Sequence, residues 1–180
     1  MVHRRKDDIA TPKGEWGTPL QLFNTLNAEH GPFEVDLAAT EENTKCDVYL
    51  DKEVNSLEYE WRKFRNAFLN PDYSKGVIDA FMEKAMEETR VPGLRVTALI
   101  PLAGETVWFQ KYVMKAAEIR LIAGRVKYVG KRTDGSIVTQ SPAFTSCIAI
   151  FDKSLEQFGG RPTLGPTIQQ TDRVRRKKDA

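Results

Sequence analysis

The sequence predicts an α/β protein with a doubly wound, largely parallel sheet. Strand-like and helix-like patterns alternate between about residue 33 and residue 122, which is the order that strand-helix-strand units produce. Residues 94–102 are almost continuously apolar, as expected for a strand that is covered on both faces. With 180 residues and 41% apolar content, the chain is long enough for one domain with a real core.

The first element is expected to be a helix that starts near Thr18. Thr18 offers a hydroxyl group as N-cap, Pro19 suits the first helical position, and Gln21 can reach back to the cap. Apolar residues recur at helical spacing from residue 20, and Gly31-Pro32 ends the pattern. Trp16, just outside this helix, is interpreted either as a core residue or as a cover for a flat ligand.

Two short strands, residues 33–39 and 47–51, are expected next, and both carry acids near their ends. Asp36 precedes small residues, so a ligand could approach the backbone there and meet a carboxylate. Asp51 lies where an open α/β sheet often places a ribose-binding acid, and Glu53 is the alternative. For each acid, a solvated loop position is the other interpretation.

A polar loop at residues 70–74 follows the apolar strand that ends at Leu69. The side-chain oxygen of Asn70 and the backbone carbonyl of Pro71 can accept hydrogen bonds from an exocyclic amino group, and Tyr73 offers a flat face for stacking. An ordinary turn between a strand and a helix would use the same residues. A helix is expected directly after Ser74, and Pro92-Gly93 closes it.

The second half of the chain is expected to add a helix from Gly104-Glu105 to about residue 117, strands at 118–122 and 145–151, and a hairpin. The hairpin, residues 124–135, turns at Asp134-Gly135 and has an aromatic residue between basic ones. These basic residues suit contact with a phosphate backbone. They are Arg125, Lys127, Lys131 and Arg132.

Composition and charge restrict the other possibilities. The net charge is only +2, but basic residues gather at both ends of the chain. No stretch has the length of a membrane span or the pattern of a signal peptide, so an intracellular protein without membrane contact is expected. The two cysteines are far apart, which predicts neither a disulfide nor a metal site. We expect flexible basic ends at 1–13 and 159–180 around one domain at 14–158.

The motifs together resemble the small phage-type DNA adenine N6-methyltransferases over about residues 14–152. The resemblance implies a compact Rossmann-like methyltransferase sheet, S-adenosylmethionine as methyl donor and adenine in double-stranded DNA as substrate. It also implies an enzyme encoded by a phage or prophage and active in the cytoplasm of a bacterial host. The segments that carry it are Trp16-Gly17-Thr18-Pro19 with Leu22-Phe23, Val35-Asp36-Leu37-Ala38-Ala39, Leu57 with Trp61, Asn70-Pro71 with Tyr73-Ser74, Trp108-Phe109 and Gly124-Arg125-Val126.

The resemblance also assigns roles to individual residues. Asn70 and Pro71 would hold the amino group of an extruded adenine, Tyr73 would stack on its ring, and Asp72 completes this catalytic tetrapeptide. The hairpin residues Arg125, Lys127, Lys131 and Arg132 would contact DNA. The donor would be bound by Trp16, Thr18, Pro19, Asp36, Leu37, Ala38, Asp51 and Asn70.

One position departs from the family pattern, because Asp72 stands where the family has a second proline. The carboxylate could face solvent, meet the positive sulfonium of the donor, or mark an altered enzyme. Two alternative functions therefore stay open. The chain could be an inactive protein that binds DNA or donor, or an enzyme that modifies another amino-bearing base.

Overall fold

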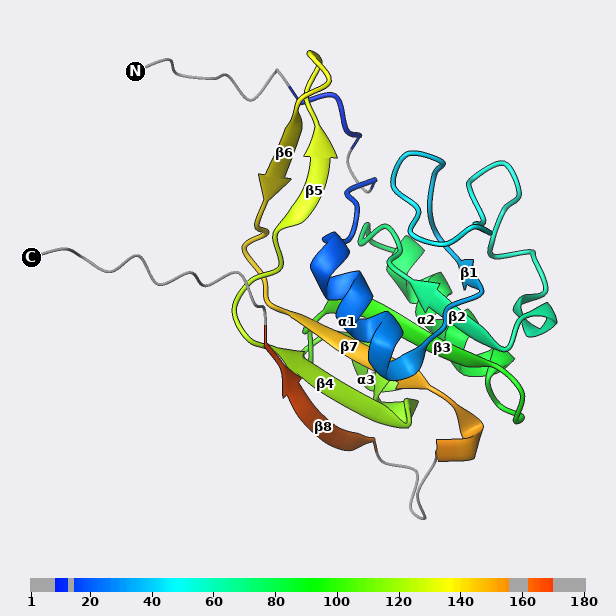
Figure 1. Cartoon of the computed structure of the whole chain (residues 1–180). Coiled ribbons are helices and arrows are strands. Elements are labelled where there is room, and N and C mark those ends of the chain that lie inside the picture. Colours follow the sequence, from blue (N-terminus) through cyan, green and yellow to red (C-terminus); the bar gives the residue numbers. More distant parts are fainter. Residues whose placement is uncertain (1–8, 13–14, 156–161, 170–180) are drawn as a thin grey trace, which may run out of the picture.

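A six-stranded mixed sheet forms the centre of the computed structural model, which describes residues 9–12, 15–155 and 162–169 (Figure 1). Among these strands β7 alone runs antiparallel to its neighbours. The predicted α/β fold, a compact sheet of the Rossmann-like methyltransferase type, is confirmed. In spatial order the strands are β1 (Val35–Asp36), β2 (Asn66–Leu69), β3 (Arg95–Pro101), β7 (Ser146–Phe151), β4 (Glu118–Ile122) and β8 (Thr163–Ile168).

Helices cover both faces of the sheet. On one face lies α1 (Leu20–His30), and on the other lie α2 (Val77–Glu88) and α3 (Val107–Lys111), which continues into the 3-10 helix η3 (Val113–Lys115) (Figure 1). Two more 3-10 turns, η2 (Trp61–Lys63) and η4 (Lys153–Leu155), lie in the connections.

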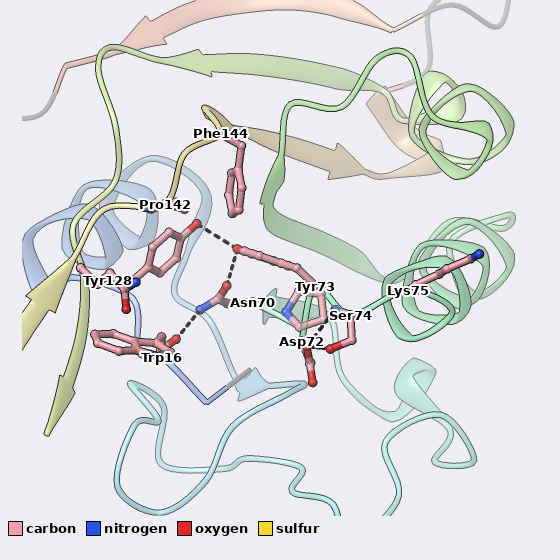
Figure 2. A pocket seen from close by; sticks show the side chains of 11 residues that line it. Trp16, Asn70, Asp72, Tyr73, Ser74, Lys75, Tyr128, Pro142 and Phe144 are labelled. Atoms are coloured by element: carbon pink, nitrogen blue, oxygen red, sulfur yellow. Dashed lines mark hydrogen bonds between the residues drawn. The ribbon is translucent and has the colours of Figure 1, made fainter. Parts of the chain in front are cut away.

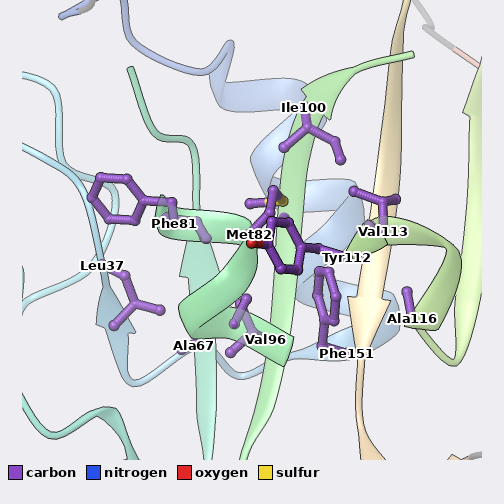
Figure 3. Close-up of a cluster of buried hydrophobic side chains, with 14 of the residues drawn as sticks. Leu37, Ala67, Phe81, Met82, Val96, Ile100, Tyr112, Val113, Ala116 and Phe151 are labelled. Atoms are coloured by element: carbon purple, nitrogen blue, oxygen red, sulfur yellow. The ribbon is translucent and has the colours of Figure 1, made fainter. Parts of the chain in front are cut away.

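Successive residues of β2 point to opposite faces, as the pleat of a strand requires. Ala67 and Leu69 pack in the core beneath α2 and α3, part of which Figure 3 shows. Phe68 packs on the other side, where its ring meets that of Phe23 on α1 at 5.2 Å between centroids. Because both faces of β2 are buried, the polar loop that follows starts from a rigid position.

The first helix begins later than its capping pattern predicted. Helix α1 starts at Leu20 with Pro19 as N-cap, and no side chain caps it, so the prediction of Thr18 as N-cap was wrong. The reason lies one residue earlier, because Gly17 pairs with Val129 through its N–H (2.8 Å) and its carbonyl (2.9 Å). This pairing keeps the backbone extended as it enters Pro19. The end of the helix at Gly31 was predicted correctly.

Three predicted elements are shorter in the structure. The strand expected at 33–39 is limited to β1, Val35–Asp36. Residues 47–51 form an isolated bridge between Tyr49 and Asp36 rather than a strand, because the chain then turns at Asp51, whose carboxylate accepts backbone N–H bonds from Glu53 and Val54. The helix expected to reach residue 117 ends at Lys111. The tighter 3-10 turn η3 follows it.

The predicted hairpin is present as β5 (Tyr128–Lys131) and β6 (Ile137–Gln140), and it projects from the sheet (Figure 1). Gly135 in its turn has φ 78°, a conformation that glycine adopts without strain. The segment before the domain is not a free end throughout, since Ala10 and Thr11 donate backbone hydrogen bonds to the Lys131 carbonyl at 2.9 and 3.2 Å. The prediction of a flexible start is therefore wrong for residues 9–12; residues 1–8 and 13 lie outside the described residues.

The prediction of a flexible C-terminal tail is wrong where the structure describes it. Residues 163–168 form β8, which pairs in parallel with β4 and completes the sheet. Arg120 on β4, only 6% exposed, donates to the Pro166 carbonyl at 3.0 Å and pairs with Glu29 of α1. The glycine and proline content that suggested a tail instead permits close packing, because a Cβ at Gly165 would collide with the Glu118 side chain. Residues 170–180 lie outside the described residues.

Candidate active site

The predicted loop Asn70–Tyr73 lines a cavity of about 450 Å³ at the carboxyl end of β2 (Figure 2). This is the edge of the sheet where α/β proteins bind ligands. We call it the first cavity. All four residues of the predicted tetrapeptide contribute to it, so the structure brings them together. The other lining residues are Trp16, Ser74, Lys75, Tyr128, Gln140, Pro142 and Phe144.

The side-chain amide of Asn70 is held at both ends. Its Nδ2 donates to the Trp16 backbone carbonyl at 3.3 Å, and its Oδ1 accepts from the Tyr73 hydroxyl at 2.7 Å. An amide oxygen has two acceptor sites, so one of them stays available to a ligand. The amide therefore presents an acceptor of fixed orientation in the first cavity.

Tyr73 is anchored by its hydroxyl group rather than free to move over a ligand. The hydroxyl lies 3.0 Å from the Leu99 carbonyl and 2.9 Å from the Tyr128 hydroxyl. Burial raises the pKa of Tyr73 well above its ordinary value, so the phenol is neutral. Its ring meets Phe144 nearly edge to face, at 5.7 Å between centroids. Phe144 is 36% exposed and thus adds a second aromatic surface to the cavity.

Asp72 stiffens the loop in a way that a proline could not. Its Oδ1 accepts hydrogen bonds from both the backbone N–H (2.8 Å) and the hydroxyl (2.6 Å) of Ser74. Such a side-chain bond to the backbone two residues ahead fixes a turn. The residue also lines a second cavity, so it lies where the two cavities meet.

The second cavity has a volume of about 300 Å³ and lies between the chain that follows β1, the loop 50–57 and helix α2. Two of the residues predicted to bind the donor, Ala38 and Asp51, line it. The other lining residues are Glu15, Ala39, Thr40, Asn43, Leu50, Lys52, Asn55, Ser56, Leu57, Asp72, Val77 and Phe81.

The loop 51–57 owes its shape to local hydrogen bonds. Asn55 has φ 51°, and its carbonyl accepts the N–H groups of Glu58 and Tyr59. The buried Trp61 ring donates through Nε1 to the Ser56 carbonyl at 2.8 Å. Asn tolerates the left-handed conformation better than most residues. This loop therefore presents a fixed wall to the second cavity.

Several residues predicted to bind the donor do not line the second cavity. Asp36 and Leu37 are buried in the sheet, and Thr18 is buried without lining any of the five described cavities. Trp16 and Asn70 belong to the first cavity, whereas Pro19 lies on another surface.

Burial dominates the chemistry of Asp36. Its carboxyl group is only 4% exposed, and desolvation raises its pKa from 3.8 to about 7. The backbone N–H of Ala38 and the charge of Lys45 oppose this shift. Asp36 therefore acts within the sheet rather than at the wall of a cavity.

The four basic residues of the hairpin region separate into two pairs. Arg125 and Lys127 line a cavity of about 500 Å³ together with Pro19 and the first turn of α1, and we call this the basic groove. Lys131 and Arg132 lie further along the hairpin, where the Lys131 ammonium pairs with Glu42 at 3.1 Å. The groove also includes Ser141, one residue from Gln140 of the first cavity, so the two sites are neighbours.

Sequence reasoning missed Tyr128 and Phe144. Tyr128 was predicted as an aromatic residue of the DNA-facing hairpin, but it is only 5% exposed and points into the first cavity wall. Its place at the start of an alternating strand, with Lys127 exposed beside it, was the available signal. Phe144 lies in a connection without periodicity, and no sequence pattern marked it.

Two features are absent from the part of the chain that the structure describes. None of the described helices is long and apolar enough to cross a membrane. No cluster of three or more potential metal ligands occurs among the described residues. Both cysteines, Cys46 and Cys147, are free.

Comparisons with known proteins show which family the chain resembles. A DNA N-6-adenine-methyltransferase of Escherichia phage T1 is 35% identical over 104 residues, which are 58% of this chain and 42% of that protein. One of Haemophilus phage HP1 (strain HP1c1) is 29% identical over 123 residues, 67% of this chain and 69% of that protein. The chain thus spans about two fifths of the T1 protein. The family described as DNA N-6-adenine-methyltransferase (Dam) matches residues 8–178, so the chain belongs to that family.

Proposed function

We propose that this protein transfers a methyl group from S-adenosylmethionine to the N6 amino group of adenine in double-stranded DNA. The observation that carries the proposal is the pair of adjoining cavities, with Asn70 in the first and Asp72 common to both. One cavity would hold an extruded base and the other the donor. The phage origin of two relatives supports action in the cytoplasm of a bacterial host.

Asn70 and Pro71 provide what the amino group needs. The N6 lone pair is delocalised into the adenine ring and is weakly nucleophilic. Two acceptors, the free site on Asn70 Oδ1 and the Pro71 carbonyl, would draw the amino hydrogens out of the ring plane and localise the lone pair. The lone pair then forms a bond to the methyl carbon, the carbon–sulfur electrons stay on sulfur, and the nitrogen loses a proton to solvent.

The first cavity suits a planar base. Tyr73 and Phe144 supply aromatic surface, and stacking of this kind contributes about 1–3 kcal/mol per base. Extruding a base from duplex DNA costs a few kcal/mol, which stacking and the hydrogen bonds to the amino group would offset.

The second cavity suits a nucleoside-containing donor. Its volume of about 300 Å³ is at the lower end for small-molecule sites, which span about 300–1,000 Å³. Leu57 and Phe81 give it an apolar wall for a purine ring, and Asp51 offers a carboxylate for ribose hydroxyls. A bound donor would supply an electrophilic methyl group, and Asp72 would place a negative charge beside its sulfonium.

Labelling distinguishes this function from the alternatives. Purified protein is incubated with S-adenosylmethionine carrying a labelled methyl group and with unmethylated plasmid DNA, and the digested nucleosides are separated. Labelled N6-methyladenine is the expected product. Label in cytosine would indicate another base, and donor binding without transfer would indicate an inactive binding protein.

The basic groove is the proposed path of the DNA backbone. Arg125→Ala and Lys127→Ala should each weaken DNA binding about 2–10-fold near 0.1 M salt and should flatten its salt dependence, because each removes a phosphate contact. Fluorescence anisotropy with labelled duplex at several salt concentrations measures both quantities. Lys115→Ala, an exposed residue outside the groove, is the matched control. Unchanged affinity in both groove variants would remove the groove from the DNA surface.

A further inference from the structure

A line of side-chain hydrogen bonds connects the hairpin to the Asn70 amide (Figure 2). The Ser146 hydroxyl lies 3.1 Å from that of Tyr128, which lies 2.9 Å from that of Tyr73. Tyr73 then donates to Asn70 Oδ1 at 2.7 Å, and Asn70 Nδ2 donates to the Trp16 carbonyl at 3.3 Å. Tyr128 is the first residue of β5, so this line joins the hairpin to the loop that follows β2.

The Tyr128–Ser146 end of the line is buried, so the hydroxyl groups there must find their partners within the protein. Tyr128 is 5% exposed and Ser146 is 1% exposed. Burial raises the pKa of Tyr128 as well as that of Tyr73, so both phenols keep their hydrogens. Each hydroxyl group has only one hydrogen to donate, and this limits how the line can be arranged.

The direction of donation decides which way the Asn70 amide faces. When Tyr128 donates to the Tyr73 oxygen, that oxygen acts as the acceptor, and the Tyr73 hydrogen is directed to Asn70 Oδ1. Without the Tyr128 hydroxyl, the Tyr73 oxygen could instead accept from Asn70 Nδ2 and give its own hydrogen to the Leu99 carbonyl, 3.0 Å away. The amide would then rotate, give up the hydrogen bond from its Nδ2 to the Trp16 carbonyl, and turn its NH2 group toward the first cavity.

We propose that Tyr128 is a positioning residue that keeps the oxygen of Asn70 directed toward the substrate amino group by acting through Tyr73. The inference rests on the proposed function of Asn70. With the amide rotated, two NH2 groups would face each other, and neither could accept a hydrogen bond. The hairpin that carries Tyr128 thus contributes to the methyl-transfer site by orienting the Asn70 amide.

Tyr128→Phe tests this role, because it removes one oxygen and keeps the ring that packs on Tyr73 at 6.1 Å between centroids. Single-turnover methylation of unmethylated plasmid DNA should slow about tenfold, while the affinities for DNA and donor stay within about twofold of wild type. Tyr59→Phe, which removes a phenol oxygen outside both cavities, is the matched control. In the double variant Tyr73→Phe/Tyr128→Phe, the loss of methylation rate, expressed as a free energy, should be smaller than the sum of the losses in the two single variants. An unchanged rate in Tyr128→Phe, or strictly additive losses, would overturn the proposal.

A second measurement does not depend on activity. The side-chain NH2 signals of Asn70 are identified in a ¹H–¹⁵N spectrum by their loss in Asn70→Asp. They should shift or broaden in Tyr128→Phe and stay unchanged in Tyr59→Phe. Unchanged Asn70 signals in Tyr128→Phe would refute the positioning role even in an active enzyme. Failure of wild-type protein to methylate adenine, with these shifts still observed, would instead count against the proposed function alone.

Discussion

The chain segments that follow β1 and β2 leave neighbouring parallel strands at the same edge of the sheet, yet they differ in construction. After β2, four consecutive residues, Asn70 to Tyr73, turn directly into the first cavity. After β1, Asp36 and Leu37 stay buried, and the second cavity is completed by the distant loop 50–57 and by α2. A contiguous motif, residues 70–75, thus supplies six of the eleven residues that line the first cavity, whereas the second cavity is assembled from separate segments.

This difference shows where single substitutions should act. In the loop after β2, no neighbouring side chain can take over the proposed role of another, so a single substitution should remove a chemical step. Around the second cavity, many residues share the contact with a ligand. Single changes there should reduce affinity gradually.

The largest effect is expected from Asn70→Ala, which removes the only side-chain acceptor assigned to the amino group. Methyl transfer should fall at least about 100-fold, as when one oriented hydrogen-bonding group is removed from other active sites. Because Asn70 lies in a half-buried loop, the melting temperature should change little. Nucleoside analysis after incubation with labelled donor measures the rate. Asn24→Ala, an exposed asparagine on α1, is the control, and full activity of Asn70→Ala would disprove the site assignment.

An intermediate effect is expected from Asp72→Asn, at the meeting point of the two cavities. Asparagine can still accept the hydrogen bonds from Ser74, so the loop is retained while the charge is lost. Affinity for the cationic donor should fall about 3–10-fold, whereas affinity for its neutral thioether product should not change. Isothermal titration calorimetry with both ligands gives the ratio of the affinity for the donor to the affinity for the product. Glu105→Gln, an exposed acid outside both cavities, is the control, and equal losses for both ligands would exclude an electrostatic role.

The smallest effect, and one on stability alone, is expected from Asp36→Asn. The folded pKa of about 7 lies above the ordinary 3.8, so the folded state retains the proton more tightly than the unfolded state. The stabilisation is complete below about pH 4 and is lost as the pH rises through about 7. The melting temperature of the variant minus that of wild type should therefore be larger near pH 8 than near pH 5. Asp47→Asn, an exposed acid, serves as control, and a pH-independent difference would contradict the raised pKa.

The same contrast explains how much the sequence could predict. The fold class, the strand ending at Leu69 and the tetrapeptide followed from contiguous patterns, which local rules describe well. The second cavity did not, since its walls come from segments between Glu15 and Phe81 that meet only in the folded chain. The role of Tyr128 in the first cavity was missed, because the hydrophobic pattern of a short hairpin does not reveal which of its faces is buried. Strand β8 was missed because its glycine and proline resemble a loop when the partner strand is unknown.

Strand β8 covers the outer edge of β4. Its backbone groups pair with β4, which would otherwise present a row of unsatisfied donors and acceptors. If a protease cut the chain before Thr163 and the fragment dissociated, β4 would become an exposed edge that the equivalent strand of a second molecule could join. The C-terminal strand therefore covers an edge of β4 that would otherwise be open to such pairing.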